Sequence, residues 1–264
     1  MWEGLAEMEI TVQDITFCYR STPSLSGISL DLKESEVLGM IGPNGSGKTT
    51  LLKCINKILE PKQGHILLDG RQLKDMSRLE VAKNLGYVPQ STASNPDALP
   101  VFEIVLMGRR PHFSWQSSEG DIEKVWAALK MLNIEHLSLR DFYELSGGEQ
   151  QKVLIARSVA QEAKVLLLDE PTSNLDIRHQ LEVMELTRRL VSEEKLAAAV
   201  SIHDLNLAAR FCNKIVLMKD GRIFAAGDAH SVLTPENISA AYGVRVEVNF
   251  ERSIPYIIPI ESVQ

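Results

Sequence analysis

Apolar and polar residues alternate along two stretches near the amino terminus, Glu9–Tyr19 and residues 28–32. An alternation with a period of two is typical of strands that bury one face. Because the two stretches are close in the chain, they predict an antiparallel sheet in the amino-terminal part of the fold.

Farther along, short apolar runs alternate with stretches of helical spacing. The runs that predict strands are Val37–Ile41, residues 64–69, Leu85–Val88 and residues 165–168, 197–202 and 215–218. The stretches that predict helices begin at Lys48 and after Asp204, and cover residues 101–107, 121–132, 147–161 and 176–194. This order indicates a parallel sheet covered by helices, an α/β fold with a mostly helical middle. Residues 244–250 and 254–260 predict a terminal hairpin.

The strand predicted at Val37–Ile41 leads directly into a glycine-rich loop. Loop and helix start match the pattern Gly-x-x-x-x-Gly-Lys-Ser/Thr at every required position, with residues Gly42, Pro43, Asn44, Gly45, Ser46, Gly47, Lys48 and Thr49. Glycines let backbone N–H groups point inward at an anion, so the loop predicts a cradle for a triphosphate. We expect Lys48 to neutralise the β- and γ-phosphates and the Thr49 hydroxyl to bind Mg²⁺.

A second apolar strand, at residues 165–168, ends in the adjacent carboxylates Asp169 and Glu170. An acidic pair at a strand end is often only a solvated turn. In a chain that also has a phosphate loop, the first carboxylate can orient Mg²⁺ and the second can activate water beside the γ-phosphate. We therefore assign Asp169 to the metal and Glu170 to the role of general base.

Residues 145–151, Leu-Ser-Gly-Gly-Glu-Gln-Gln, begin the helix predicted at 147–161. Ser146 can cap this helix, and Gly147 and Gly148 expose backbone amides at its positive end. Taken alone, the segment could be an ordinary helix cap. Together with the phosphate loop it predicts a second anion site in the same chain.

Composition limits the kinds of partner. The chain has 264 residues, 44% of them hydrophobic, which fits one large globular domain. Its formal net charge of −7 argues against a broad basic surface for nucleic acid. The widely separated Cys18, Cys54 and Cys212 suggest neither a disulfide framework nor a metal-ligand pair. Residues 1–7 do not look like a signal peptide, and no apolar run approaches ~18 residues, so we expect no membrane span.

The phosphate loop, the segment at 145–151 and the Asp169-Glu170 strand, in this order, resemble the nucleotide-binding subunit of an ATP-binding-cassette (ABC) transporter. The resemblance covers nearly the whole chain. It implies a mixed central sheet with an amino-terminal antiparallel β subdomain and a helical insertion. It also implies ATP and Mg²⁺ as ligands, and a homodimer that sandwiches two ATP molecules because each signature segment completes the site of the other copy.

The same resemblance implies roles for further residues. By matching motif positions, Tyr19 would stack on adenine, Gln90 would contact Mg²⁺ and water, and His203 would touch the γ-phosphate. Asp176 would belong to the loop that couples the two sites of the dimer. The residues expected to bind nucleotide within this resemblance also include Thr50, Ser146, Gly147, Gly148 and Glu149.

The resemblance also implies an organisation of the chain as one ABC ATPase domain, residues 1–264. The ATP-binding core would comprise residues 8–90 and 164–243, the helical subdomain residues 91–163, and the terminal hairpin residues 244–264. Within the helical subdomain, residues 105–112, which include Arg109, resemble importers of iron chelates, haem and cobalamin. In that branch this region contacts the membrane subunits.

The expected protein is thus the ATPase of such an importer, peripheral on the cytoplasmic face of the membrane. Its partners would be permease subunits and, indirectly, a substrate-binding protein. An exporter subunit is the main alternative, since its ATP site would look the same. A DNA-repair ATPase would need a long coiled coil or a zinc hook between the half-motifs, and a translation-associated protein usually has two nucleotide-binding halves. A pure scaffold is hard to reconcile with Glu170 and His203.

Overall fold

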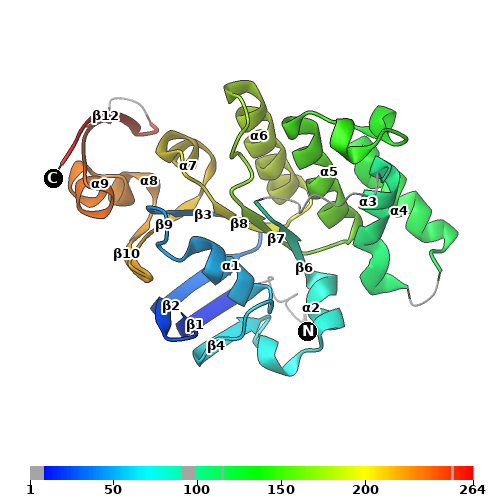
Figure 1. Ribbon diagram of the computed structural model, residues 1–264, viewed down its shortest axis with the longest axis horizontal. Helices are drawn as coiled ribbons and strands as arrows, with labels where there is room; N and C mark the ends of the chain where they lie inside the picture. Colours follow the sequence, from blue (N-terminus) through cyan, green and yellow to red (C-terminus); the bar gives the residue numbers. More distant parts are fainter. Residues whose placement is uncertain (1–8, 91–98, 114–115, 251–252, 264) are drawn as a thin grey trace, which may run out of the picture.

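The computed structural model describes residues 9–90, 99–113, 116–250 and 253–263 (Figure 1). The expectation for residues 1–7 lies outside these ranges, as does part of the predicted helical subdomain, residues 91–98 and 114–115. Within the described ranges the chain forms three sheets, and helices cover the largest of them (Figure 1).

The amino-terminal sheet is antiparallel, as the alternating pattern predicts. Its strand order is β2-β1-β4-β5. The strands are β1 Glu9–Tyr19, β2 Thr22–Lys33, β4 Gln63–Leu68 and β5 Arg71–Gln72. Strand β2 is longer than its apolar pattern indicated because its first residues are paired with β1 while their side chains stay largely exposed.

The central sheet has the order β10-β9-β3-β8-β7-β6. Its strands are β3 Val37–Ile41, β6 Leu85–Val88, β7 Val165–Asp169, β8 Ala197–Ser201, β9 Lys214–Lys219 and β10 Arg222–Gly227. All pairings are parallel except that of β10, which returns antiparallel from β9. The sheet is therefore mixed, and the fold class predicted for the chain is confirmed.

The helices fill the layers around this sheet. They are α1 Lys48–Ile55, α2 Arg78–Asn84, α3 Val101–Leu106, α4 Glu119–Met131, α5 Gly147–Ala160, α6 Ile177–Glu193, α7 Leu205–Phe211, α8 Ala229–Val232 and α9 Pro235–Tyr242. Short 3₁₀ segments are η1 Leu73–Asp75, η2 Met107–His112, η3 Glu135–Leu137 and η4 Phe142–Glu144. Among the described residues, none of the helices has the length and apolarity needed to cross a bilayer.

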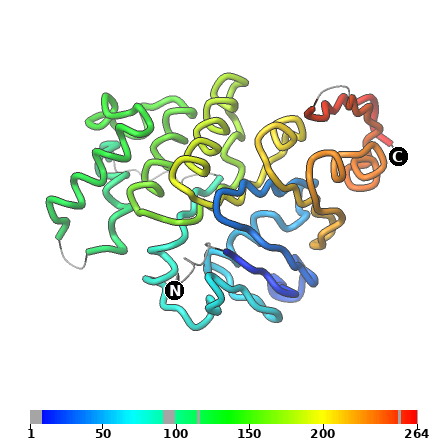
Figure 2. The backbone as a smooth tube through the Cα atoms, turned by 180° about the vertical axis from the view of Figure 1, so that it is seen from behind, coloured from blue at the N-terminus to red at the C-terminus, as the bar shows by residue number. Residues whose placement is uncertain are grey.

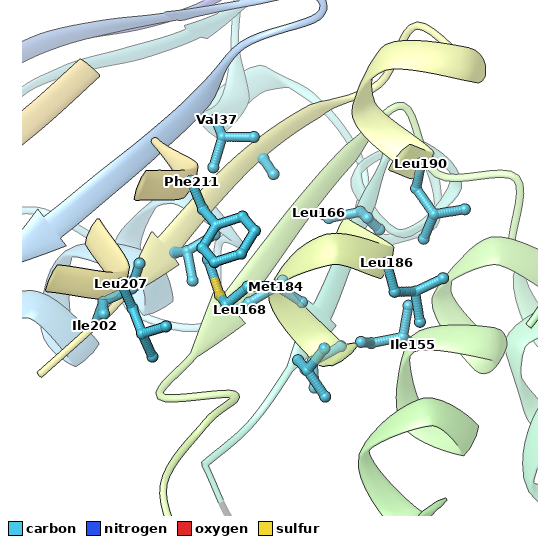
Figure 3. Close-up of a cluster of buried hydrophobic side chains, with 14 of the residues drawn as sticks. Val37, Ile155, Leu166, Leu168, Met184, Leu186, Leu190, Ile202, Leu207 and Phe211 are labelled. Carbon is cyan, nitrogen blue, oxygen red and sulfur yellow. The ribbon is translucent and has the colours of Figure 1, made fainter. Parts of the chain in front are cut away.

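Both faces of the central sheet carry an apolar core. Along β7, Leu166 and Leu168 pack into the core shared with α5, α6 and α7, and Figure 3 shows this cluster with Met184 and Phe211. Val165 and Leu167 point to the other face, toward α1 and the antiparallel sheet. Strands buried on both faces read as continuous apolar runs, which is why they were recognisable from the sequence.

Helices α3, α4 and α5 pack against one another at the end of the molecule opposite to the carboxyl terminus (Figure 1). Arg109 lies inside this group and is buried. Its guanidinium is 2.9 Å from Asp121 Oδ1 and 2.7 Å from Glu162 Oε2, and it donates to the Ala160 carbonyl. Arg109 therefore stabilises the helical region and is not free to contact a partner, in contrast to its exposed neighbour Arg110.

The carboxyl-terminal part adds α8, α9 and the predicted hairpin, formed by β11 Val244–Asn249 and β12 Tyr256–Ser262. Figure 2 shows this unit beside α7, at the end of the molecule away from α4. Cys18, Cys54 and Cys212 are free thiols.

Candidate nucleotide site

The phosphate loop connects β3 to α1 in the strand, loop and helix order that its sequence requires. Gly42 has φ of 144°, and a Cβ atom there would lie 2.2 Å from the carbonyl oxygen of Met218. Gly47 has φ of 103°, and its Cβ would lie 2.8 Å from the carbonyl oxygen of Ser24. Only glycine fits such positions. The loop is thus shaped by contacts with β9 and β2.

Lys48 is the first residue of α1, and its side chain folds back over the loop. The ammonium donates to the carbonyl oxygens of Gly42 at 2.7 Å and of Pro43 at 3.1 Å. Burial lowers the pKa of Lys48, while the charges of Glu170 and Asp169 act in the opposite direction. The two carboxylates therefore help to keep a positive charge at the centre of the loop.

Asp169, at the end of β7, lies directly beside Thr49. The Thr49 hydroxyl donates to Asp169 Oδ1 at 2.8 Å, and the Tyr87 hydroxyl donates to Oδ2 at 3.1 Å. Burial raises the pKa of Asp169, and the two hydrogen bonds oppose this rise. A hydroxyl and a carboxylate oxygen are ligands that Mg²⁺ prefers.

Sequence reasoning assigned no role to Tyr87. The only signal available was its place just before Gln90, at the end of a strand parallel to β7. The described residues contain no group of three His, Cys, Asp or Glu side chains that could hold a metal on their own. A metal at Thr49 and Asp169 would thus depend on phosphate and water for its other ligands, which is usual for Mg²⁺.

Glu170 follows in a left-handed backbone conformation, with φ of 51°. Such a conformation is rare for a residue with a side chain and is enriched at functional sites. His203 Nε2 lies 2.6 Å from Glu170 Oε1, and the Gln90 side-chain amide donates to Glu170 Oε2. The structure thus brings together the three residues predicted to be catalytic, from the ends of three neighbouring strands.

A pocket of about 290 Å³ opens over the phosphate loop. Its lining comprises Tyr19, Ser24, Asn44, Gly45, Ser46, Gly47, Lys48, Thr49, Thr50 and Glu170. Tyr19 stands at the rim, with its ring half exposed and held edge-on by Phe17 at a centroid distance of 4.9 Å. The hydroxyl of Thr50 accepts a hydrogen bond from Ser24 at 3.0 Å, so Thr50 ties the loop to β2.

The signature segment does not line this pocket. Ser146 caps α5 by accepting from the Glu149 amide, and the Glu149 carboxylate accepts in return from the Ser146 amide at 2.9 Å. Hydrogen bonds from Ser146 lower the pKa of Glu149. Ser146 and Gly147 are exposed, whereas Gly148 is buried against the ring of His179. The segment predicted to form a second anion site is thus separate from the pocket over its own phosphate loop.

Asp176 caps α6 and is linked to the signature segment through His179. Its carboxylate accepts from the His179 amide at 2.9 Å and lies 2.9 Å from His179 Nδ1. These hydrogen bonds lower the pKa of Asp176. His179, which had no expected role, packs on Gly148. The loop before α6 and the start of α5 are therefore held as one surface.

A phosphate loop whose lysine faces paired strand-end carboxylates, with a separate capped glycine segment, defines a nucleoside-triphosphatase site. The family model of the ABC transporter matches residues 25–173. The chain belongs to the ABC transporter family and is an ATP-binding, ATP-hydrolysing subunit of it.

Several curated relatives are similar over most of their length. An uncharacterized ABC transporter ATP-binding protein of Methanocaldococcus jannaschii is 48% identical, with 96% of this chain and 98% of the relative covered. The hemin import ATP-binding protein HmuV of Pseudomonas putida is 41% identical, with 94% and 99% covered. The cobalamin import ATP-binding protein BtuD of Halobacterium salinarum is 39% identical, with 91% of this chain and 60% of the relative covered.

Solved structures agree with this assignment. A metal-chelate type ABC transporter in an inward-facing conformation matches with a TM-score of 0.85 and 30% identity, over 97% of this chain and 98% of that one. A dimeric bacterial ABC transporter cassette matches with a TM-score of 0.73 and 30% identity, over 83% and 98%.

Proposed function

We propose that this subunit drives an importer for a metal chelate or related cofactor, that is, a siderophore, haem or cobalamin. The observation that supports import is the similarity to hemin and cobalamin import proteins and to a metal-chelate transporter, which extends over more than nine-tenths of the chain. The match to the metal-chelate transporter covers 97% of this chain, so it is not confined to the ATP site.

In the proposed mechanism, the pocket over the phosphate loop binds ATP. Tyr19 stacks on the adenine, and loop amides at residues 42–50 surround the phosphates while Lys48 neutralises their charge. Mg²⁺, when bound at Thr49 and Asp169, offsets charge on the β- and γ-phosphates. Tyr87 supports this role of Asp169 by holding its second oxygen.

Glu170 is the proposed general base. Its carboxylate accepts the proton of the attacking water, and the Gln90 amide and His203 hold that carboxylate from either side. In this proposal His203 turns from Glu170 to a γ-phosphate, and its partly exposed side chain leaves room for such a movement. Gln90 is the proposed contact to Mg²⁺ and water, which links the metal to the base.

The proposed active form is a homodimer with two ATP molecules at the interface. The exposed Ser146 and Gly147, with Gly148 and Glu149, form an anion-binding surface that does not serve the phosphate loop of the same copy. A second copy placed head to tail would bring them to a γ-phosphate, where the positive end of α5 favours a negative charge. Asp176 would couple the two sites.

A groove of about 500 Å³ is the proposed contact for a permease subunit. It lies between the core residues 56–58, α2 and the segment η2, and exposed Met107 and Arg110 form part of its wall. Gln90 follows β6, whose Leu85 and Tyr87 line the same groove. A change at Gln90 could thus reach the groove directly.

In this scheme residues 8–90 and 164–243 form the core, 91–163 the helical subdomain and 244–264 the hairpin unit.

The subunit would lie peripherally on the cytoplasmic face of the membrane, and a substrate-binding protein would deliver the cargo from the other side. The test is purification of the Glu170→Gln protein from its native membranes with ATP, followed by identification of bound proteins. A polytopic permease encoded near a substrate-binding protein is the expected result. A permease of an export system, or ribosomal or DNA-repair proteins, would contradict the importer while leaving the ATPase in place.

A further inference from the structure

The side chain of Asn206 links the terminal hairpin to helix α7 by two hydrogen bonds. The Asn206 amide nitrogen donates to the Ile257 carbonyl at 3.1 Å, and the Ile257 amide donates to Asn206 Oδ1 at 2.8 Å. Ile257 itself is buried, in the middle of β12. The side chain thus pairs with the outer edge of β12 much as another strand would.

Asn206 is three residues from His203, and hydrogen bonds restrain the backbone between them. The Asp204 carboxylate caps α7 by accepting from the amides of Asn206 at 2.8 Å and Leu207 at 3.0 Å. Helix α7 spans only seven residues, Leu205–Phe211, so its position depends on tertiary contacts more than on intrinsic helix stability. The hydrogen bonds between Ile257 and Asn206 therefore help to determine the position of His203.

The hairpin unit is anchored independently on the phosphate-loop side. The Lys219 ammonium, at the end of β9, donates to the Ala240 carbonyl of α9 at 2.8 Å. The same end of β9 forms a wall of the loop, because the Gly221 amide donates to the Ser46 carbonyl at 3.2 Å and the Met218 carbonyl packs on Gly42. The unit is thus fixed at one end to the phosphate loop and at the other to the helix behind His203.

The Tyr242 hydroxyl, at the end of α9, lies on the phosphate-loop side of this unit. Its hydroxyl is buried and makes no hydrogen bond of good geometry within the described part of the chain. Burial raises the pKa of Tyr242 to about 12, and the backbone of Gly42 acts against this rise. The hydroxyl therefore lies close to the first residue of the phosphate loop.

We propose that Asn206 is a positioning residue for ATP hydrolysis: by binding Ile257 of the terminal hairpin, it fixes the start of α7 so that His203 stays in register with Glu170. The proposal rests on the role suggested above for His203. In this proposal the hairpin does more than cover the core: through Asn206 it holds the start of α7, and α7 in turn determines the position of His203.

The test compares steady-state ATPase rates of full-length variants at saturating Mg-ATP. Asn206→Ala is expected to lower kcat about fivefold to tenfold, with KM changed by less than about twofold, since the loss of two neutral hydrogen bonds is felt in placing a catalytic group and not in binding ATP. Asn206→Asp keeps the acceptor for the Ile257 amide but loses the donor, and should give an intermediate kcat. Asn237→Ala is the matched control, because Asn237 binds the Val232 carbonyl and caps no part of α7.

A double-mutant cycle with His203→Ala separates positioning from general stability. If Asn206 acts through His203, Asn206→Ala causes no further loss of single-turnover rate in the His203→Ala background. An equal fold-loss in both backgrounds, or a lower Tm with unchanged kcat, would show a merely structural role and overturn the inference. Should His203→Ala alone retain full turnover, the proposed role of His203 fails instead. If Asn206→Ala does not fold, Asn206→Asp carries the same cycle.

Discussion

Glu170 Oε1 lies 2.6 Å from His203 Nε2, so the proposed base and the proposed phosphate sensor are in direct contact. Glu170 directly follows β7 and His203 lies just beyond β8, and these strands are adjacent and parallel. Their carboxyl ends meet at the same edge of the sheet, where ligands of open α/β folds usually bind. The contact is thus a consequence of strand order.

Replacement of Glu170 by glutamine should remove the base and leave the shape of the site intact. We expect turnover to fall by at least about 100-fold, within the usual range for loss of general-base catalysis, with ATP affinity within about threefold of the parent. Rates of phosphate release and binding of a fluorescent ATP analogue would measure the two effects. Glu194→Gln, an exposed acid just after the end of α6, is the control, and near-normal turnover of Glu170→Gln would remove Glu170 from the mechanism.

Tyr87→Phe should weaken Mg-ATP binding without unfolding the protein. The substitution deletes the hydroxyl that donates to Asp169 Oδ2 at 3.1 Å. We expect KM for Mg-ATP to rise about fivefold, the equivalent of ~1 kcal/mol for one hydrogen bond, with a smaller effect on kcat. Tyr256→Phe, at an exposed position of the hairpin, should leave both constants unchanged. A parental KM in Tyr87→Phe would show that the hydrogen bond to Asp169 is dispensable.

Gly148→Ala should disrupt the signature surface, because the new Cβ would lie 2.4 Å from His179 Cδ2. Light scattering in the Glu170→Gln background should show loss of ATP-dependent dimerisation. Removal of the ring by His179→Ala should restore part of it, since the clash is then relieved. Gly120→Ala, where the nearest atom would be 3.7 Å away, serves as control. Unimpaired dimerisation of Gly148→Ala, or no recovery in the double variant, would contradict the role of this packing.

The buried pair of Arg109 and Asp121 should make the helical region sensitive to acid. Hydrogen bonds from Ser118 and Arg109 lower the pKa of Asp121 from 3.8 to about 2. A depressed pKa stabilises the folded state above the unfolded-state value, and this contribution is lost as the pH falls through the folded value.

Denaturant unfolding of the parent and of Asp121→Asn should therefore differ most above pH of about 4, and the gap should narrow toward pH 2. Glu123→Gln, an exposed acid on the same helix, is the control and should show no such convergence. A difference that stays constant across this range would mean that packing alone, and not the charge of Asp121, stabilises the region.

Much of the nucleotide site could be read from the sequence because its parts are local. The phosphate loop needs a strand, glycines at set positions and a helix, and all lie within residues 37–55. Likewise, Ser146 and Glu149 form a capping box, a motif that can be recognised within four consecutive residues. Buried parallel strands could be predicted from apolar runs for the same reason, because a strand that is buried on both faces needs apolar residues along its own length.

Other elements could not be predicted because they are stabilised by strand pairing, helix caps and tertiary packing, and not by an apolar pattern of their own. Strand β10 alternates weakly and ends in Ala225, Ala226 and Gly227, and is a strand because β9 pairs with it. Helices α8 and α9 are short and held by caps at Asp228 and Thr234. Arg109 was expected at a partner surface, and burial between Asp121 and Glu162 placed it inside instead.

By itself the sequence determined the order of the main buried strands and longer helices, the phosphate loop, the capped signature helix and the identity of the acids at the end of β7. The tertiary structure decided which of these groups meet. Gln90, Glu170 and His203 come from three strands that are distant in sequence, and the grip of Asn206 on Ile257 spans 51 residues. Contacts of that range depend on sheet order and on the packing of both faces, which no local pattern encodes.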